Sequence, residues 1–359
     1  MRDTAGASET VAPEQDSRER VLASTSVAGI GLGPLESLVA DESVTDVLVN
    51  GSAGVWVDRG AGLQPAGVEL HDDAALRRLA VRLASLAGQR LDAAAPYVDG
   101  LLPSGIRLHA VLPPLVDGAA HISLRVPRRV PPSLEELGRW GMFDRQTEAL
   151  LRQIVRARLA FVVGGGTGSG KTTLMSALLS QVPASERMVV VEDVRELRVR
   201  HPHVVHLQGR APNVEGRGEV TLTTLVRQAL RMRPDRVVLG EARGAEVREL
   251  MTALNTGHEG GCGTIHANSP ADVVSRFQAL GALAGLRPEA VETQLASAVQ
   301  VVMHCAHTPS GRRLSHVAVL RRREGRIQVR TALRAERKGY AGGSGQQDLD
   351  DLLERRELR

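Results

Sequence analysis

One segment constrains the fold of this chain more than any other. Residues 165–172 read GGTGSGKT and match the pattern G-x-x-x-x-G-K-[ST]. The apolar run LAFVV at 159–163 precedes the segment, and the helical pattern TLMSALL at 173–179 follows it. A glycine-rich loop between a buried strand and a helix lets backbone N–H groups surround a phosphate at the helix N-terminus. The sequence therefore predicts an α/β fold in which this loop binds the phosphates of a nucleotide.

The residues of this segment are expected to bind a nucleotide, and two of them have specific roles. Lys171 should reach the β- and γ-phosphates, and the Thr172 hydroxyl should ligate Mg²⁺. ATP is the default nucleotide, because no base-reading motif is recognisable. The predicted nucleotide-binding residues of this segment are Gly165, Gly166, Thr167, Gly168, Ser169, Gly170, Lys171, Thr172 and Thr173.

The length of 359 residues favours two domains. Before the loop, strand-like segments at 44–49, 55–57, 105–112 and 120–126 surround a helical pattern that begins at Asp72 or Asp73. After it, short apolar runs at 159–163, 188–191, 237–239 and 301–303 are typical of buried parallel strands. The predicted organisation is a flexible arm (1–33), an α+β domain (34–126), a proline-bounded linker (127–133), a P-loop domain (134–335) and a flexible charged tail (336–359).

Acidic residues follow two of the apolar runs. Glu192 and Asp193 directly follow the run at 188–191, and Glu196 comes shortly after them. Glu241 directly follows the sequence RVVLG at 236–240. Hydrolysis needs one group that orients or deprotonates water and another that holds the Mg²⁺ shell, and both should lie at the carboxyl ends of neighbouring strands. These carboxylates are the candidates for both roles.

The order of motifs resembles a known family. The phosphate loop, VVVEDVREL, LRMRPDRVVLGEARGAE and TGHEGGCGTIHANSP follow one another as in the type II/IV secretion ATPases. Within that family the sequence is most similar to the CpaF-like ATPases of tight-adherence (Tad) pili and their conjugal-transfer-associated relatives. The resemblance implies a RecA-like P-loop ATPase domain behind a smaller α+β N-terminal domain. It also implies a hexameric motor that converts ATP and water to ADP and phosphate to power pilus assembly or secretion.

The same resemblance assigns residue roles. It places the catalytic glutamate on Glu192 and the Walker B glutamate, which contacts Mg²⁺ through water, on Glu241. Asp193 and Glu196 complete the acidic motif. His258 and His266 bound the histidine motif, and in the family these histidines face the nucleotide.

Arginines are the candidates for completing the site. The resemblance suggests that Arg107 and Arg125, on strands of the N-terminal domain, reach the nucleotide when that domain closes. Four arginines cluster around the Walker B strand, and one or two of them are expected to serve the nucleotide or a subunit interface and the rest a solvated face: Arg231, Arg233, Arg236 and Arg243.

The composition of the chain limits the kinds of binding partner and the cellular location that we expect. Aromatic residues make up only 2%, and the formal net charge is +4, which argues against a nucleic-acid partner. Cys262 and Cys305 supply neither a disulfide framework nor a zinc site, and Cys262 is expected to pack as a small hydrophobe. With no apolar stretch of membrane-spanning length, we expect a cytoplasmic protein, peripheral to the inner membrane through platform proteins of a pilus or secretion system.

Two alternatives stay open at this point. A nucleic-acid translocase or conjugal DNA-transfer ATPase would use the same RecA-like core and would suit the basic isoelectric point. A small-molecule kinase should instead show an acceptor pocket and a lid. The sequence does not decide between extension and retraction of a fibre, or name the substrate that is moved.

Overall fold

The computed structural model describes residues 31–60, 62–70, 72–102, 105–127, 131–210, 212, 217–309, 311–323, 326–337 and 339–357. The chain divides into two compact units between Arg129 and Val130, and each is described by itself. Most of the expected N-terminal arm (1–30) and the centre of the expected linker (128–130) lie outside the described residues.

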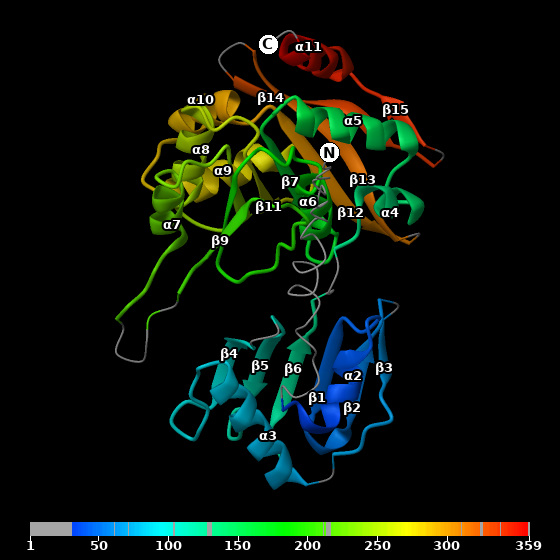
Figure 1. Ribbon diagram of the computed structural model, residues 1–359, viewed down its shortest axis with the longest axis vertical. Coiled ribbons are helices and arrows are strands. Elements are labelled where there is room, and N and C mark those ends of the chain that lie inside the picture. Colours follow the sequence, from blue (N-terminus) through cyan, green and yellow to red (C-terminus); the bar gives the residue numbers. More distant parts are fainter. Residues whose placement is uncertain are drawn as a thin grey trace, which may run out of the picture. The chain divides into compact units, whose positions relative to one another are not determined.

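Unit 1 contains a six-stranded antiparallel sheet in the order β3-β2-β1-β6-β5-β4. Figure 1 shows the sheet with its helices. The elements are η1 (Gly33–Leu35), α2 (Glu36–Ala40), β1 (Asp46–Asn50), η2 (Gly51–Ala53), β2 (Val55–Asp58), β3 (Leu63–Pro65), α3 (Asp73–Leu86), β4 (Tyr97–Leu101), β5 (Arg107–Val111) and β6 (His121–Arg125).

The helix predicted in this unit is confirmed as α3. Asp72 caps it, because its side chain accepts a hydrogen bond from Ala74 N at 2.9 Å. Leu76, Leu79 and Leu83 recur on one face and are buried. In β1 the side chains alternate between buried and more accessible positions, as expected for a sheet with one face on the core.

Unit 2 is built on a nine-stranded sheet in the order β15-β14-β13-β12-β7-β11-β10-β8-β9. Its first part comprises α4 (Leu134–Arg139), α5 (Arg145–Arg156), β7 (Phe161–Gly165), α6 (Lys171–Leu179), β8 (Met188–Glu192), β9 (Val204–Gln208), α7 (Leu222–Ala229) and β10 (Arg236–Ala242). The remainder comprises α8 (Val247–Asn255), β11 (Cys262–His266), α9 (Asp272–Leu283), α10 (Pro288–Ala298), β12 (Val301–Thr308), β13 (Gly311–Arg323), β14 (Arg326–Ala335), β15 (Tyr340–Gly342) and α11 (Gln346–Glu357).

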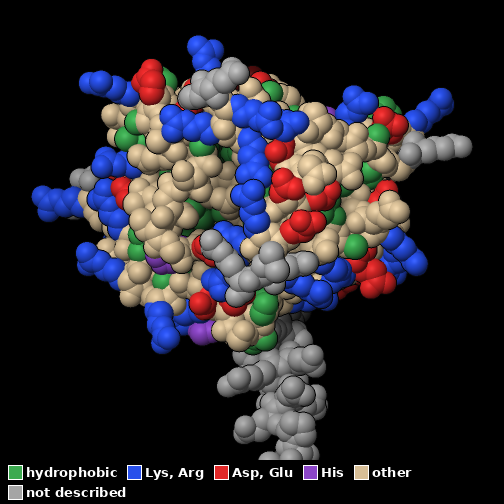
Figure 2. Space-filling view, turned by 90° about the horizontal axis from the view of Figure 1, so that it is seen from above, with side chains coloured by type: hydrophobic (Ala, Val, Ile, Leu, Met, Phe, Trp, Pro, Cys, Tyr) green, Lys and Arg blue, Asp and Glu red, His purple; other side chains and the backbone are tan. Residues whose placement is uncertain are grey.

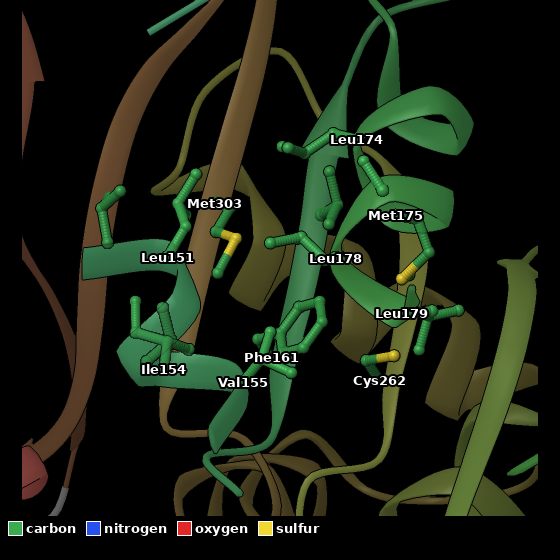
Figure 3. Close-up of a cluster of buried hydrophobic side chains, with 14 of the residues drawn as sticks. Leu151, Ile154, Val155, Phe161, Leu174, Met175, Leu178, Leu179, Cys262 and Met303 are labelled. Carbon is green, nitrogen blue, oxygen red and sulfur yellow. The ribbon is translucent and has the colours of Figure 1, made fainter. Parts of the chain in front are cut away.

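The four apolar runs of the sequence form β7, β8, β10 and β12, which confirms the α/β prediction. The strands from β12 to β9 pair in parallel, with helices on both faces of the sheet (Figure 1). On one face, side chains of α5 and α6 pack on β7 and its neighbours (Figure 3). Every residue of β7 and β8 is buried, which explains why these runs are continuous rather than alternating. No helix of the described residues is long and apolar enough to cross a lipid bilayer.

The C-terminal segment differs from the expected flexible tail. It pairs as β15 with β14 and then forms α11, whose Leu349 and Leu353 are buried in the core. Asp348 of α11 forms ion pairs with Arg321 and Arg330. The charged residues that suggested a mobile tail therefore surround only two buried leucines. Two apolar positions are too few to indicate a packed helix in a sequence with so many charges.

Candidate active site

The phosphate loop needs glycine at two positions. Gly165 ends β7 with φ +150°, and a Cβ there would collide with the carbonyl oxygen of Cys305. Gly170 caps α6 in the left-handed region, with φ +95°. The loop therefore passes tightly between β7 and α6, so that the N-terminus of α6 opens at the carboxyl edge of the sheet.

Lys171 folds back onto this loop. Its Nζ donates to the carbonyl oxygens of Gly165 at 2.9 Å and Gly166 at 2.8 Å, and the residue is only 8% exposed. Burial lowers the pKa of Lys171, whereas the negative charge of Glu241 opposes that shift. Because its partners are neutral carbonyls, the ammonium group of Lys171 can exchange them for phosphate oxygens, and no ion pair has to break for this.

Glu192 is the last residue of β8, and each of its carboxylate oxygens has a different set of neighbours. Its Oε1 accepts hydrogen bonds from the backbone N–H groups of Glu196 at 3.0 Å and Leu197 at 2.8 Å. Its Oε2 lies 3.6 Å from Nδ1 of His206 on β9. The carboxylate is therefore fixed by the loop after β8, and it is 4% exposed. Asp193, the next residue, is exposed.

Glu241 contacts two basic side chains. Its Oε1 lies 2.7 Å from Nε2 of His266, at the end of the neighbouring strand β11, and Arg243 donates to its Oε2. That hydrogen bond raises the pKa of Arg243. Burial is the main cause that lowers the pKa of His266, and the positive charge of Lys171 adds to it. His266 is therefore held towards its neutral form, which can still donate one hydrogen bond.

Four predicted residues thus meet at one edge of the sheet. Glu192, Glu241 and His266 lie at or near the carboxyl ends of β8, β10 and β11, and Lys171 begins α6, which the loop joins to the carboxyl end of β7. The four strands are adjacent in the sheet. Next to them, an open pocket of about 490 Å³ is lined by His266, Ala267, Asn268, Asp272, Ser275, Arg276 and Ala279. A cation, two carboxylates and an imidazole beside a phosphate loop can bind a nucleoside triphosphate and activate water.

His258 does not join this group. It lies before β11, at the amino end of the strand, where its Nδ1 is 3.2 Å from the carbonyl oxygen of Ala253 at the end of α8. His266 lies at the carboxyl end of the same strand. Within unit 2 the five residues of β11 therefore separate the two histidines, and only His266 lies beside Glu241.

Arg236 also differs from expectation. It is fully buried, donates through Nε to Glu186 at 2.7 Å, and donates through Nη2 to the Val155 carbonyl at 2.9 Å. It begins β10, whereas Glu241 lies near the end of that strand. Arg236 therefore satisfies buried polar groups of the scaffold and does not serve the nucleotide.

Arg107 and Arg125 are direct neighbours in unit 1. They are register partners on β5 and β6, so their side chains project from the same face of the sheet. Arg125 is exposed, and Asp46 of β1 is its partner on the other side. Asp46, Arg125 and Arg107 therefore lie in one row across β1, β6 and β5.

Two residues near the loop were missed by sequence reasoning. Arg312, at the start of β13, donates from Nε to the Gly168 carbonyl at 2.8 Å. His206 lies beside Glu192 because β9 pairs with β8. No motif marks either residue, since one comes from a hairpin 144 positions away and the other from an edge strand whose pairing the sequence does not specify.

Both cysteines are core residues. Cys262 and Cys305 are fully buried, and burial raises the pKa of each thiol to about 12. The expectation that Cys262 packs as a small hydrophobe is confirmed. Among the described residues, no group of three or more His, Cys, Asp or Glu side chains is arranged to hold a metal ion.

Most of the chain is similar in sequence to known proteins. The family model described as "Type II/IV secretion system protein" matches residues 29–345. A Mycobacterium tuberculosis protein described as a conjugal transfer protein is 54% identical over 314 residues, which cover 86% of this chain and 89% of that protein. The type IV secretion system protein VirB11 of Brucella suis is 31% identical over 319 residues, covering 80% of this chain and 88% of that protein.

Solved structures share the fold. The pilus retraction motor PilT with bound ADP has a TM-score of 0.56 at 18% identity, covering 90% of this chain and 88% of that one. The Legionella pneumophila ATPase DotB has a TM-score of 0.55 at 17% identity, covering 90% and 85%.

Proposed function

The chain belongs to the type II/IV secretion system protein family and is a P-loop ATPase. From that premise we propose that it is a ring-forming cytoplasmic motor, in which unit 1 of the same or another copy completes the nucleotide site of unit 2. The observation that carries the proposal is the convergence of Lys171, Glu192, Glu241 and His266 at the carboxyl edge of one sheet. The work it powers is pilus assembly or secretion. Secretion is supported by the relative described as a type IV secretion system protein, and pilus assembly by the family resemblance of the motifs.

The chemistry follows from the side chains. ATP binds with its β-phosphate in the loop, and Lys171 moves from the Gly165 and Gly166 carbonyls to the β- and γ-phosphate oxygens. The Oε2 of Glu192, which does not accept from the loop after β8, orients a water molecule and accepts its proton. The water oxygen bonds to the γ-phosphorus as the bond to the bridging oxygen breaks, which releases ADP and phosphate. His266 then lies where it can contact the γ-phosphate.

The residues present also fit Mg²⁺. Among the described residues, Glu241 Oε1 is buried and accepts no hydrogen bond of good geometry, although His266 Nε2 is close. An unsatisfied carboxylate oxygen of this kind suits a water in a Mg²⁺ shell, and the Thr172 hydroxyl in the first turn of α6 suits the metal itself. When bound, Mg²⁺ would neutralise charge on the β- and γ-phosphates.

The arginine pair of unit 1 supports a shared site. Arg107 and Arg125 lie side by side on one face of the sheet, and two neighbouring guanidinium groups suit the oxygens of a phosphate. We place the γ-phosphate of a nucleotide there when unit 1 closes on a unit 2 of the same or another copy. A cation delivered in this way contributes about 10³-fold or more to phosphoryl transfer.

A site shared between copies implies an assembly. A heterologous interface that closes by rotation forms a ring, and the family resemblance indicates six copies. Force would then pass to the inner membrane through platform proteins docked on the ring.

Nucleic-acid translocation is the second candidate, since several relatives are described as conjugal transfer proteins. On the face shown in Figure 2, Lys and Arg side chains form a band near the centre, with acidic side chains beside it. The formal net charge of +4 agrees with this mixed surface. We therefore favour protein partners.

The experiment is a phosphate-release assay over a range of protein concentrations, with light scattering on the same samples. The proposal predicts that specific activity rises with concentration as the mass approaches six copies, and that Arg107→Ala with Arg125→Ala lowers hydrolysis while ATP binding remains. A monomer with full activity at every concentration would contradict it. Stimulation many-fold by DNA would favour the translocase.

A further inference from the structure

Arg312 borders the phosphate loop from the side away from the catalytic carboxylates. We propose that Arg312 is a nucleotide-binding residue whose guanidinium packs against the base and ribose of the bound nucleotide. This inference rests on the proposed function, because it assumes that the loop holds the phosphates of that nucleotide.

Its contacts place Arg312 on the outer surface of the loop. The Nε atom donates to the Gly168 carbonyl at 2.8 Å. The Cδ atom lies 3.4 Å from the position that a Cβ would take at Gly170, the residue that caps α6. The aliphatic part of the side chain therefore lies along the start of α6, where the phosphate chain of a nucleotide ends and its ribose begins.

The sheet order gives the direction of the nucleotide. The strands β11, β10 and β8, which carry the acidic residues and His266, lie on one side of β7, and the hairpin of β12 and β13 lies on the other (Figure 1). The γ-phosphate must point towards Glu192 and Glu241, where water is activated. With the β-phosphate in the loop, the ribose and base must leave on the opposite side, towards β12 and β13.

Arg312 is equipped to meet a base there. The side chain is exposed, and among the described residues only the Gly168 carbonyl forms a hydrogen bond with it, through Nε. The face of the guanidinium and its Nη groups are therefore available. A planar guanidinium stacks on aromatic rings, and every nucleobase offers such a face.

The position of Arg312 is firmly set by its neighbours. Arg313 turns to the other face of β13 and donates to the carbonyls of Glu336 and Gly339. Leu314 N donates to the Met142 carbonyl at 3.0 Å, and the buried Met142 Cε lies 3.6 Å from the Cβ position of Gly170. The start of β13 is thus held against the loop from both sides.

The test compares ligands with and without a nucleoside. Binding of ATP, ADP and inorganic tripolyphosphate is measured by calorimetry on wild type, Arg312→Ala and Arg312→Lys, with Arg322→Ala, exposed on the same strand, as the matched control. We expect Arg312→Ala to raise the Kd of ATP and ADP about 3- to 30-fold, in the range of a cation–π contact. The Kd of tripolyphosphate should change less than about twofold. Arg312→Lys keeps the charge without the planar group, so its Kd for ATP should lie between those of wild type and Arg312→Ala.

Other results would overturn the inference. Equal weakening of ATP and tripolyphosphate would show that Arg312 only braces the loop, and unchanged ATP affinity in both Arg312 variants would show that it contacts no nucleotide. If Arg312→Ala does not fold, Arg312→Lys decides alone, with wild-type ATP affinity as the contradicting result. A wild-type protein that binds neither ligand would defeat the proposed function itself, and the inference with it.

Discussion

The side chain of Glu192 packs directly over Gly240. A Cβ at position 240 would lie 2.5 Å from Glu192 Cγ and 3.1 Å from its Oε1. This contact explains why glycine precedes Glu241 in β10, because the residue at position 240 must lack a side chain for Glu192 to lie between β8 and β10. The pairing of these strands, Leu239 beside Val191, sets the approach.

Gly240→Ala should therefore impair hydrolysis without touching the nucleotide. The added methyl group displaces the Glu192 carboxylate, and a shift of about 1 Å at a catalytic group lowers a rate by roughly 10²-fold. Phosphate release and ATP affinity measure the two effects. Gly67→Ala, where a Cβ meets nothing within 4 Å, is the control. Unchanged turnover in Gly240→Ala would mean that the position of Glu192 does not matter.

Glu192→Gln should stop hydrolysis and keep the fold. The Gln oxygen can still accept from the N–H groups of Glu196 and Leu197, so the melting temperature should hold within a few degrees. Without a base, turnover should fall about 10²- to 10⁴-fold. Rapid-quench measurements with bound ATP test this, and turnover within twofold of wild type would refute the role of Glu192.

Glu241→Gln should instead change the dependence on Mg²⁺. An amide holds the water of a Mg²⁺ shell less strongly than a carboxylate, and it leaves Arg243 without its ionic partner. The Mg²⁺ concentration for half-maximal hydrolysis should rise severalfold. If that shift occurs in Glu192→Gln and not in Glu241→Gln, the two roles are exchanged.

Stability should fall in mild acid because of His304. Burial lowers the pKa of this histidine from its ordinary 6.5. The unfolded chain therefore binds more protons as the pH drops below 6.5, so the free energy of unfolding decreases there, by at most about 1.4 kcal/mol per pH unit for one group. When the free energy of unfolding is measured with urea between pH 7 and 5, it should change less with pH in His304→Gln than in wild type. His307→Gln, exposed on the same strand, should keep the wild-type slope.

The sequence predicted the centre of this protein better than its edges. The strand, loop and helix around Lys171, and the acids after β8 and β10, follow from continuous apolar runs that end in polar residues. The packed C-terminus could not be read in the same way, because α11 buries only Leu349 and Leu353 among many charges. Long-range pairing was equally hidden: Arg312 reaches the loop only because β13 folds back beside β12. The sequence also did not show that His258 and His266, which bound one motif, lie at opposite ends of β11.

The most direct test of the account is phosphate release by wild type and Lys171→Ala at equal concentration. Removing the Lys171 ammonium leaves the apolar sheet intact, so circular dichroism and melting should change little while hydrolysis falls at least about 10²-fold. Hydrolysis at the wild-type rate by a folded Lys171→Ala variant would contradict the assignment of this loop as the site of ATP turnover.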